Sequence, residues 1–350
     1  MQTIQTLREL HGSFQAAFDK NEKSLEEYRK TDSKQLKAYL LESNTPLNLV
    51  GCPDGEWNRL EDTQWYVSKG GKHPNLLSLD ASRERVWILY SLIDADESSK
   101  IVDKWIKNKR GGLDKCWLSR SQLLHWENLG SKWTERGLGI RFSDGLTPKK
   151  LAGNVSLKAW YGASPHSSSI RGIHELLVQA KKDFAISSVR WQKRSEDGSS
   201  VTTEWYSDGK VTVNQALDVD EVLNWISEMG NRYEDALIEA TGLRDSKTAP
   251  FEIDFNQPID LDAFSKTVAN GQGDMKLWLM EIERSEDFRR YKGVDLHTWD
   301  RILLDIGPGY AYLTIPGDGC VNAAPRLAVI QGEDNAGVTS IYHDGMEVFT

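Results

Sequence analysis

The sequence predicts an α+β protein, and three features of its pattern predict this class. Helical periodicity marks the N-terminal segment, β-rich stretches joined by Asp-Gly turns mark the C-terminal half, and further helices recur between strands. We therefore expect a helical N-terminal segment, a mixed central α/β region, and an antiparallel β-meander and hairpins with packed helices in the C-terminal half. At 350 residues, the chain is long enough for about two domains with cores of their own.

The first 42 residues are predicted to form two helices. Apolar residues recur at helical spacing from Ile4 to Phe18, and the same spacing continues from Leu25 to Leu40. Residues 44–80 contain several Gly, Pro and Asn clusters, which are typical of turns. We therefore expect residues 1–80 to form a helical and turn-rich N-terminal region.

A basic, tryptophan-rich α/β region is expected over residues 81–183. Val86–Ile93 reads as a buried strand, a helix follows at about 100–108 with Ser98 or Ser99 as its cap, and 113–118 returns as a strand. A strand, a helix and a strand within so short a stretch form the minimal parallel crossover unit. The rest of the region is predicted as a short helix from Arg120, strands at 138–142 and 154–161, and a helix ending near 183.

An acidic α+β domain is expected over residues 184–350. Its clearest signal is a three-stranded antiparallel meander at 185–194, 200–206 and 210–215, because Asp-Gly pairs between these stretches supply the positive φ angles of tight hairpins. The remaining elements are predicted as a helix at 218–241, a strand at 251–255, a helix at 261–268, a strand at 276–282, and a hairpin of 339–343 against 346–349.

Charge is segregated along the chain. The net charge of −9 is made up of −3 over residues 1–100, +11 over 101–194 and −17 over 195–350. Tryptophan is also unusually frequent, because its 13 copies outnumber Tyr and Phe. A partner meets a local surface rather than an average, so the basic region permits a polyanionic partner although the whole chain is acidic.

Several protein classes are excluded by missing patterns. The longest nearly apolar run, Val86–Ile93, is far too short for a bilayer-spanning helix, which needs about 20 residues. The first 30 residues contain no apolar core of a secretory signal. Three cysteines give no disulfide framework and no CxxC, and there is no phosphate-binding loop, GxSxG or HExxH motif. These absences favour a cytoplasmic, non-enzymatic protein without a cofactor or metal.

The basic region is the main candidate for a binding site. Lysine and arginine neutralise phosphates, and tryptophan stacks on unpaired bases, so we expect contact with DNA or RNA here. Lysines at the end of a helix also complement its dipole, and buried tryptophans serve a core, so an ordinary structural role stands beside this hypothesis. The candidate residues are Lys104, Lys107, Lys109, Arg110, Lys115, Arg120, Lys132, Arg136, Arg190 and Arg194.

Four carboxylates on two predicted strands form a second candidate site. Alternation places Glu252 and Asp254 on one face of their strand, and Glu281 and Glu283 on one face of theirs. If the two strands were parallel neighbours, these oxygens would converge on Mg²⁺ or Mn²⁺. The simpler interpretation is the solvent face of a half-exposed sheet.

The sequence thus predicts a non-catalytic intracellular subunit of a multi-protein assembly that contacts nucleic acid through residues 101–194 and associates with another protein subunit. The first alternative is a metal-dependent hydrolase or nuclease that uses the four carboxylates. The second is a protein–protein interaction module, which a large exposed apolar patch would favour. In each case the acidic C-terminal domain either keeps the protein dispersed, or binds a basic partner or the chain's own basic region and restricts access to it.

Overall fold

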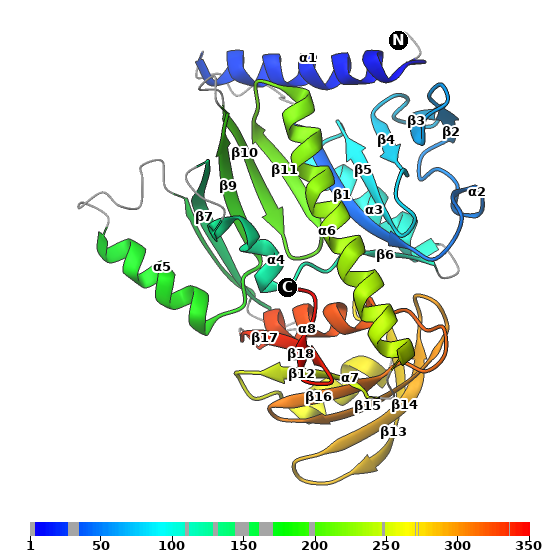
Figure 1. Ribbon diagram of the computed structural model, residues 1–350, viewed down its shortest axis with the longest axis vertical. Helices are drawn as coiled ribbons and strands as arrows, with labels where there is room; N and C mark the ends of the chain where they lie inside the picture. Colours follow the sequence, from blue (N-terminus) through cyan, green and yellow to red (C-terminus); the bar gives the residue numbers. More distant parts are fainter. Residues whose placement is uncertain are drawn as a thin grey trace. The chain divides into compact units, whose positions relative to one another are not determined.

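The computed structural model describes residues 4–26, 35–108, 112–128, 132–143, 154–160, 171–195, 200–246, 249–269, 271, 273–335 and 337–350. Within them the chain forms helices and two antiparallel sheets, which confirms the α+β class (Figure 1).

The chain divides into two compact units, and each is discontinuous in sequence. The first unit comprises Met1–Cys116, Gly130–Thr134 and Trp191–Glu234, and the second comprises Trp117–Leu129, Glu135–Arg190 and Asp235–Thr350. This division cuts across the three consecutive regions expected from the sequence, because strands of the acidic half pair with strands near the N-terminus.

The first unit is built on one sheet with the strand order β2-β3-β4-β5-β1-β11-β10-β9, and β6 pairs with β1 beyond this path. Its strands are β1 (Lys37–Ser43), β2 (Glu56–Arg59), β3 (Trp65–Lys69), β4 (Leu77–Asp80), β5 (Val86–Ser91), β6 (Leu113–Lys115), β9 (Ser188–Arg194, of which Trp191–Arg194 belong to this unit), β10 (Ser200–Tyr206) and β11 (Lys210–Gln215). Its helices are α1 (Leu7–Glu26), α2 (Leu47–Val50), α3 (Ala95–Asn108) and the first half of α6 (Val219–Ser246).

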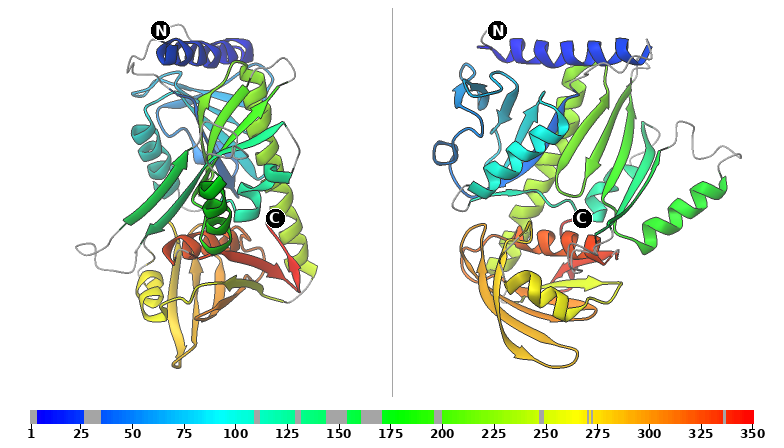
Figure 2. Two further views of the ribbon diagram at one scale, coloured as in Figure 1. Left: turned by 90° about the vertical axis from the view of Figure 1, so that its left-hand side faces the viewer. Right: turned by 180° about the vertical axis from the view of Figure 1, so that it is seen from behind.

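Helix α3 covers one face of this sheet (Figure 2). Val102, Trp105 and Ile106 on the helix pack with Tyr39 of β1 and Leu89 of β5 in one buried apolar cluster. The opposite face of α3 is therefore left to solvent, as expected for an amphipathic helix that covers a sheet.

Strand β1 corrects one sequence prediction. The helix expected from Leu25 to Leu40 is wrong over Lys37–Leu40, which belong to a strand, whereas residues 27–34 lie outside the described residues. All seven residues of β1 are buried between β5 and β11. A strand buried on both faces shows no clean alternation, so its apolar residues also fit a helical spacing. The N-terminal helix and the meander order β9, β10, β11 are confirmed.

The two strands of the predicted crossover unit, β5 and β6, are not neighbours in the sheet, because β1 lies between them. β5 and β6 both pair antiparallel with β1, so they run parallel to each other on either side of it.

Helix α3 also begins earlier than expected. Asp94 rather than a serine accepts the backbone N–H of Asp96 at 3.0 Å, whereas the hydroxyl of Ser98 lies 2.5 Å from the hydroxyl of Tyr39.

The second unit contains a seven-stranded sheet with the order β13-β14-β15-β16-β12-β17-β18, and most of the hairpin of β7 and β8. Its strands are β7 (Trp133–Ser143, of which Trp133 and Thr134 belong to the first unit), β8 (Asn154–Trp160), β12 (Phe251–Phe255), β13 (Leu277–Arg284), β14 (Arg289–Asp295), β15 (Arg301–Gly307), β16 (Tyr310–Thr314), β17 (Thr339–His343) and β18 (Met346–Glu347). Its helices are α4 (Arg120–Leu123), the 3₁₀ helix η1 (His125–Asn128), α5 (Arg171–Asp183), the second half of α6, α7 (Leu261–Ala269) and α8 (Ala323–Asp334).

Local signals predict the C-terminal hairpin but miss α8. Asp344 and Gly345 both have positive φ and join β17 to β18, as the Asp-Gly pair predicts. Helix α8 is buried almost all round, so its sequence carries no amphipathic stripe. Among the described residues, no helix is both long and apolar enough to cross a bilayer.

Candidate functional site

Three lysines form an exposed stripe on α3, which we call the α3 lysine stripe: Lys100, Lys104 and Lys107. Their spacing of four and three residues places them on one helix face, away from the buried Trp105. None of the three has a hydrogen-bond or ion-pair partner among the described residues. Lys109 and Arg110, which were expected to extend this site, lie outside the described residues.

Other predicted basic residues have partners within their own unit. In the first unit, the ammonium of Lys115 lies 3.2 Å from Asp103 and 3.5 Å from Asp208. In the second, Arg120 donates to the backbone carbonyl of Lys181 at 2.9 Å. These side chains are used for structure, so they are weaker candidates for contact with a partner.

The remaining candidates differ in exposure. Lys132 and Arg194 are exposed in the first unit, and Arg136 is half-buried in the second. Arg190 of the second unit stacks on the ring of Trp160, with 4.1 Å from its guanidinium carbon to the ring centroid. The structure therefore divides the predicted residues between two units, and the α3 lysine stripe presents three neighbouring cations that have no partner among the described residues.

A pocket of about 390 Å³ lies beside the α3 lysine stripe, and we call it the His73 pocket. Its lining includes Cys52, Asp54, Lys72, His73, Glu97 and Lys104. Glu97, one turn into α3, lies 3.1 Å from Nε2 of His73 and also accepts a hydrogen bond from the ammonium of Lys72. Lys104 stands two helical turns beyond Glu97 and so shares its side of the helix.

A glycine-containing loop holds His73 in place. Gly70 and Gly71 both have positive φ, a conformation that side chains other than glycine adopt rarely. This turn directs the backbone N–H groups of Lys72 and His73 to the carboxylate of Asp54, at 2.9 and 2.6 Å. The loop therefore fixes the imidazole at the wall of the pocket.

Two ionisable groups of the His73 pocket, Glu97 and Cys52, have shifted pKa values with clear causes. The hydrogen bond from Lys72, together with that of His73, lowers the pKa of the Glu97 carboxyl, so this group is a carboxylate at neutral pH. Burial raises the pKa of the Cys52 thiol to about 11. Cys52 is therefore a protonated thiol at neutral pH, and only its thiolate would be a strong nucleophile.

Sequence reasoning did not find the His73 pocket. The segment Gly70-Gly71-Lys72-His73 does not match a phosphate-binding loop, and it matches no other motif that would indicate a site. The partner of His73 is 24 residues away on α3. The glycine pair followed by Lys-His was the available signal, but it carries no information about Glu97.

The expected carboxylate site is not formed. The metal site required β12 and β13 to be parallel neighbours, but β14, β15 and β16 lie between them in the sheet. At about 4.8 Å per strand, Glu252 and Asp254 are about 19 Å from β13. Glu281 and Glu283 were also expected to share a face. A β-bulge intervenes, so Glu281 pairs with Tyr291 and Glu283 with Arg290, which are adjacent residues that point to opposite faces.

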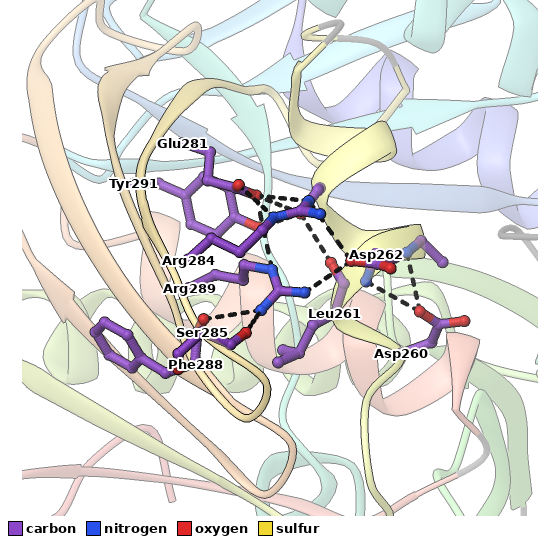
Figure 3. A network of polar contacts seen from close by, with 11 residues as sticks. Asp260, Leu261, Asp262, Glu281, Arg284, Ser285, Phe288, Arg289 and Tyr291 are labelled. Atoms are coloured by element: carbon purple, nitrogen blue, oxygen red, sulfur yellow. Dashed lines mark hydrogen bonds and ion pairs between the residues drawn. The ribbon is translucent and has the colours of Figure 1, made fainter.

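Arginines neutralise Glu281, one of the four expected ligands, and Asp262, and both carboxylates line a pocket beside α7. Glu281 accepts from Arg284 at 2.6 Å, and Arg289 donates to Asp262 at 2.8 Å (Figure 3). These guanidinium groups lower the pKa of both carboxyls. Ser265 also bonds to Glu281, at 3.1 Å. A divalent ion would have to displace this network, so the proposed metal site on Glu252, Asp254, Glu281 and Glu283 is wrong.

Comparison with known proteins gives a family. A family model described as MJECL33-like protein matches residues 1–332 of the chain. A protein of Methanocaldococcus jannaschii, described as uncharacterized protein MJECL33, is 25% identical over 342 residues, which cover 83% of this chain and 82% of the relative. No solved structure matches the chain.

Proposed function

The chain belongs to the MJECL33-like family, and from the geometry of its first unit we propose that it contacts nucleic acid through the α3 lysine stripe. The observation that carries this proposal is a set of three exposed lysines on one helix face, none of which has a partner in the described part of the chain. We retain the expectation that the protein acts in the cytoplasm as a subunit of a larger assembly.

The spacing of the α3 lysine stripe suits a phosphate backbone. Helical rise of 1.5 Å per residue separates Lys100 from Lys104 by about 6 Å and Lys104 from Lys107 by about 4.5 Å along the axis. A duplex carries one charge per about 1.7 Å of its axis, so phosphates are always within reach of such a row. Neutralising phosphates releases counterions, and this favourable effect does not depend on base sequence.

Changing Lys104→Glu and Lys107→Glu together is expected to weaken binding to a DNA duplex at least tenfold at low salt. Three phosphate contacts give a slope of about −2.7 for the logarithm of affinity against the logarithm of salt, so a fourfold rise in salt weakens the unaltered protein about 40-fold. In the variant the slope falls to about −0.9. Fluorescence anisotropy with a labelled duplex measures both quantities.

Lys292→Glu on β14 is the control, because this exposed lysine lies in the other unit and undergoes the same type of substitution as each of the two α3 lysines. It is expected to leave the affinity within about twofold, since it removes none of the three proposed phosphate contacts. Undetectable binding at low salt, or an equal loss in both variants, would contradict a contact at α3.

A second candidate function is self-association through β13, and exposed apolar side chains favour it. Trp278, Met280 and Ile282 are 56%, 65% and 49% exposed, and β13 is the edge strand of its sheet. Antiparallel pairing with a second copy about Leu279 would set Trp278 opposite Met280 and Leu277 opposite Glu281. No like charges meet in this register, and aromatic–sulfur pairs are favourable across strands.

Met280→Lys is expected to abolish this self-association, because it places a charge at the centre of the apolar strip. Sedimentation velocity over a concentration series measures the oligomeric state. Met346→Lys on β18, which replaces another exposed methionine of the same unit, is expected to leave it unchanged. A protein that stays monomeric at high concentration would rule out pairing at β13.

A further inference from the structure

His73 is placed to act as a general base, because Glu97 orients its imidazole ring. Its Nε2 is held by Glu97, whereas Nδ1 has no hydrogen-bond partner among the described residues and is not among their buried polar atoms. When Nε2 carries the proton that Glu97 accepts, Nδ1 is the free acceptor of the ring. The imidazole therefore offers a proton-accepting atom at the wall of a pocket of ligand size.

The other groups of the His73 pocket limit which reactions fit. Lys104 supplies a cation that is unpaired within the described ranges, and a cation here would stabilise negative charge that develops on a substrate. Cys52 is protonated at neutral pH, so the pocket does not supply a thiolate nucleophile. A base and a cation without a protein nucleophile suit a substrate that carries its own nucleophile beside an anionic centre.

RNA is such a substrate, because its 2′-hydroxyl is adjacent to the phosphodiester. We propose that the His73 pocket cleaves RNA, with His73 as the base for the 2′-hydroxyl and Lys104 at the phosphate. This inference rests on the proposed function, since Lys100 and Lys107 of the α3 lysine stripe would hold the strand on either side of Lys104.

The step balances without a further reactant. Nδ1 of His73 takes the proton of the 2′-hydroxyl, the 2′-oxygen forms a bond to phosphorus, and the bond from phosphorus to the 5′-oxygen breaks. The leaving 5′-oxygen takes a proton from the Lys104 ammonium, which regains one from water, and His73 releases its proton to solvent. The products are a 2′,3′-cyclic phosphate and a 5′-hydroxyl end. Glu97 is a positioning residue that orients the imidazole.

A labelled DNA oligonucleotide that contains one ribonucleotide tests the proposal, incubated with the full chain in the presence of EDTA. Cleavage is expected only at the ribonucleotide, with a cyclic phosphate product seen by mass spectrometry and with all-DNA left intact. His73→Asn is expected to slow cleavage by about 10²–10⁴-fold. Glu97→Gln is expected to lower the rate at saturating substrate while the affinity for the uncut all-DNA strand stays unchanged.

His11→Asn is the matched control, because His11 also pairs with a carboxylate, Asp220 at 3.0 Å, but lies on α1 and does not line the pocket. It is expected to cleave at the unaltered rate. Binding of RNA without cleavage would overturn this inference and leave the proposed function standing, whereas loss of all binding would remove both. Equal cleavage by His73→Asn and the unaltered protein would also overturn it, provided that thermal melting shows both to be folded.

Discussion

Replacing Arg326 with methionine is expected to lower the free energy of unfolding of the second unit by about 3–5 kcal/mol. The guanidinium of Arg326, on α8, lies 2.6 Å from the carboxylate of Asp295, and the two side chains are 0% and 1% exposed. Methionine keeps much of the volume but removes the charge. The buried Asp295 carboxylate would then lose its counter-charge where water cannot replace it, and this desolvation accounts for most of the expected loss.

A double variant separates the lost charge pair from lost packing. Asp295→Asn added to Arg326→Met removes the uncompensated charge but keeps an oxygen for the backbone N–H of His297, which donates to Asp295 at 2.9 Å. The pair of changes is therefore expected to be more stable than Arg326→Met alone by at least about 1 kcal/mol. Urea unfolding followed by far-ultraviolet circular dichroism measures each value. Arg301→Met, at an exposed position of β15, should change stability by no more than about 0.5 kcal/mol.

The fold could be predicted from the sequence wherever the determining interactions are local. The turn at Gly209, with φ of +76°, and the Asp344-Gly345 turn need only the residues they contain, so both hairpins were predicted correctly. β1 depends instead on β5 and β11, which are far away in sequence. Its burial on both faces removed the alternation that distinguishes a strand from a helix, so this prediction failed.

The candidate sites also divide into features set by local sequence and features set by contacts between distant residues. Exposure of Lys104 and Lys107 follows from their place on an amphipathic helix, and the sequence predicts it. Internal pairing of Lys115 with Asp208 depends on the meander, and the pairing of His73 with Glu97 depends on the packing of a loop beside α3. The carboxylate prediction failed for another reason. A single extra residue in β13 reverses the alternation after Glu281, and no local pattern in the sequence marks that bulge.

The tryptophans of the basic region are mostly core residues, which settles a question that their number left open. Trp105, Trp117, Trp126 and Trp191 are at most 4% exposed, whereas Trp160 is 38% exposed. Base stacking needs an accessible ring face, so the four buried residues do not provide it. The chain uses tryptophan chiefly to fill its cores.

Trp225→Ala is accordingly expected to destabilise the first unit by about 3–5 kcal/mol, the range for removing a large buried aromatic side chain. Trp225 lies on α6 and is 0% exposed. Its ring packs edge-to-face on Trp133, with 4.6 Å between ring centroids, and lies 6.1 Å from the ring of Trp205. Alanine would leave a cavity beside the rings of Trp133 and Trp205.

Urea unfolding followed by circular dichroism is the suitable measurement, because the substitution itself changes tryptophan fluorescence. Trp225→Phe should recover part of the loss, since it refills part of the cavity and retains an aromatic contact. Trp299→Ala is the control for removing an indole that is 58% exposed, and it should cost less than about 1 kcal/mol. A loss for Trp225→Ala no larger than that for Trp299→Ala would contradict this prediction. The rings of Trp133, Trp205 and Trp225 would then not be a main source of stability in the first unit. The abundance of tryptophan would need an explanation in binding instead.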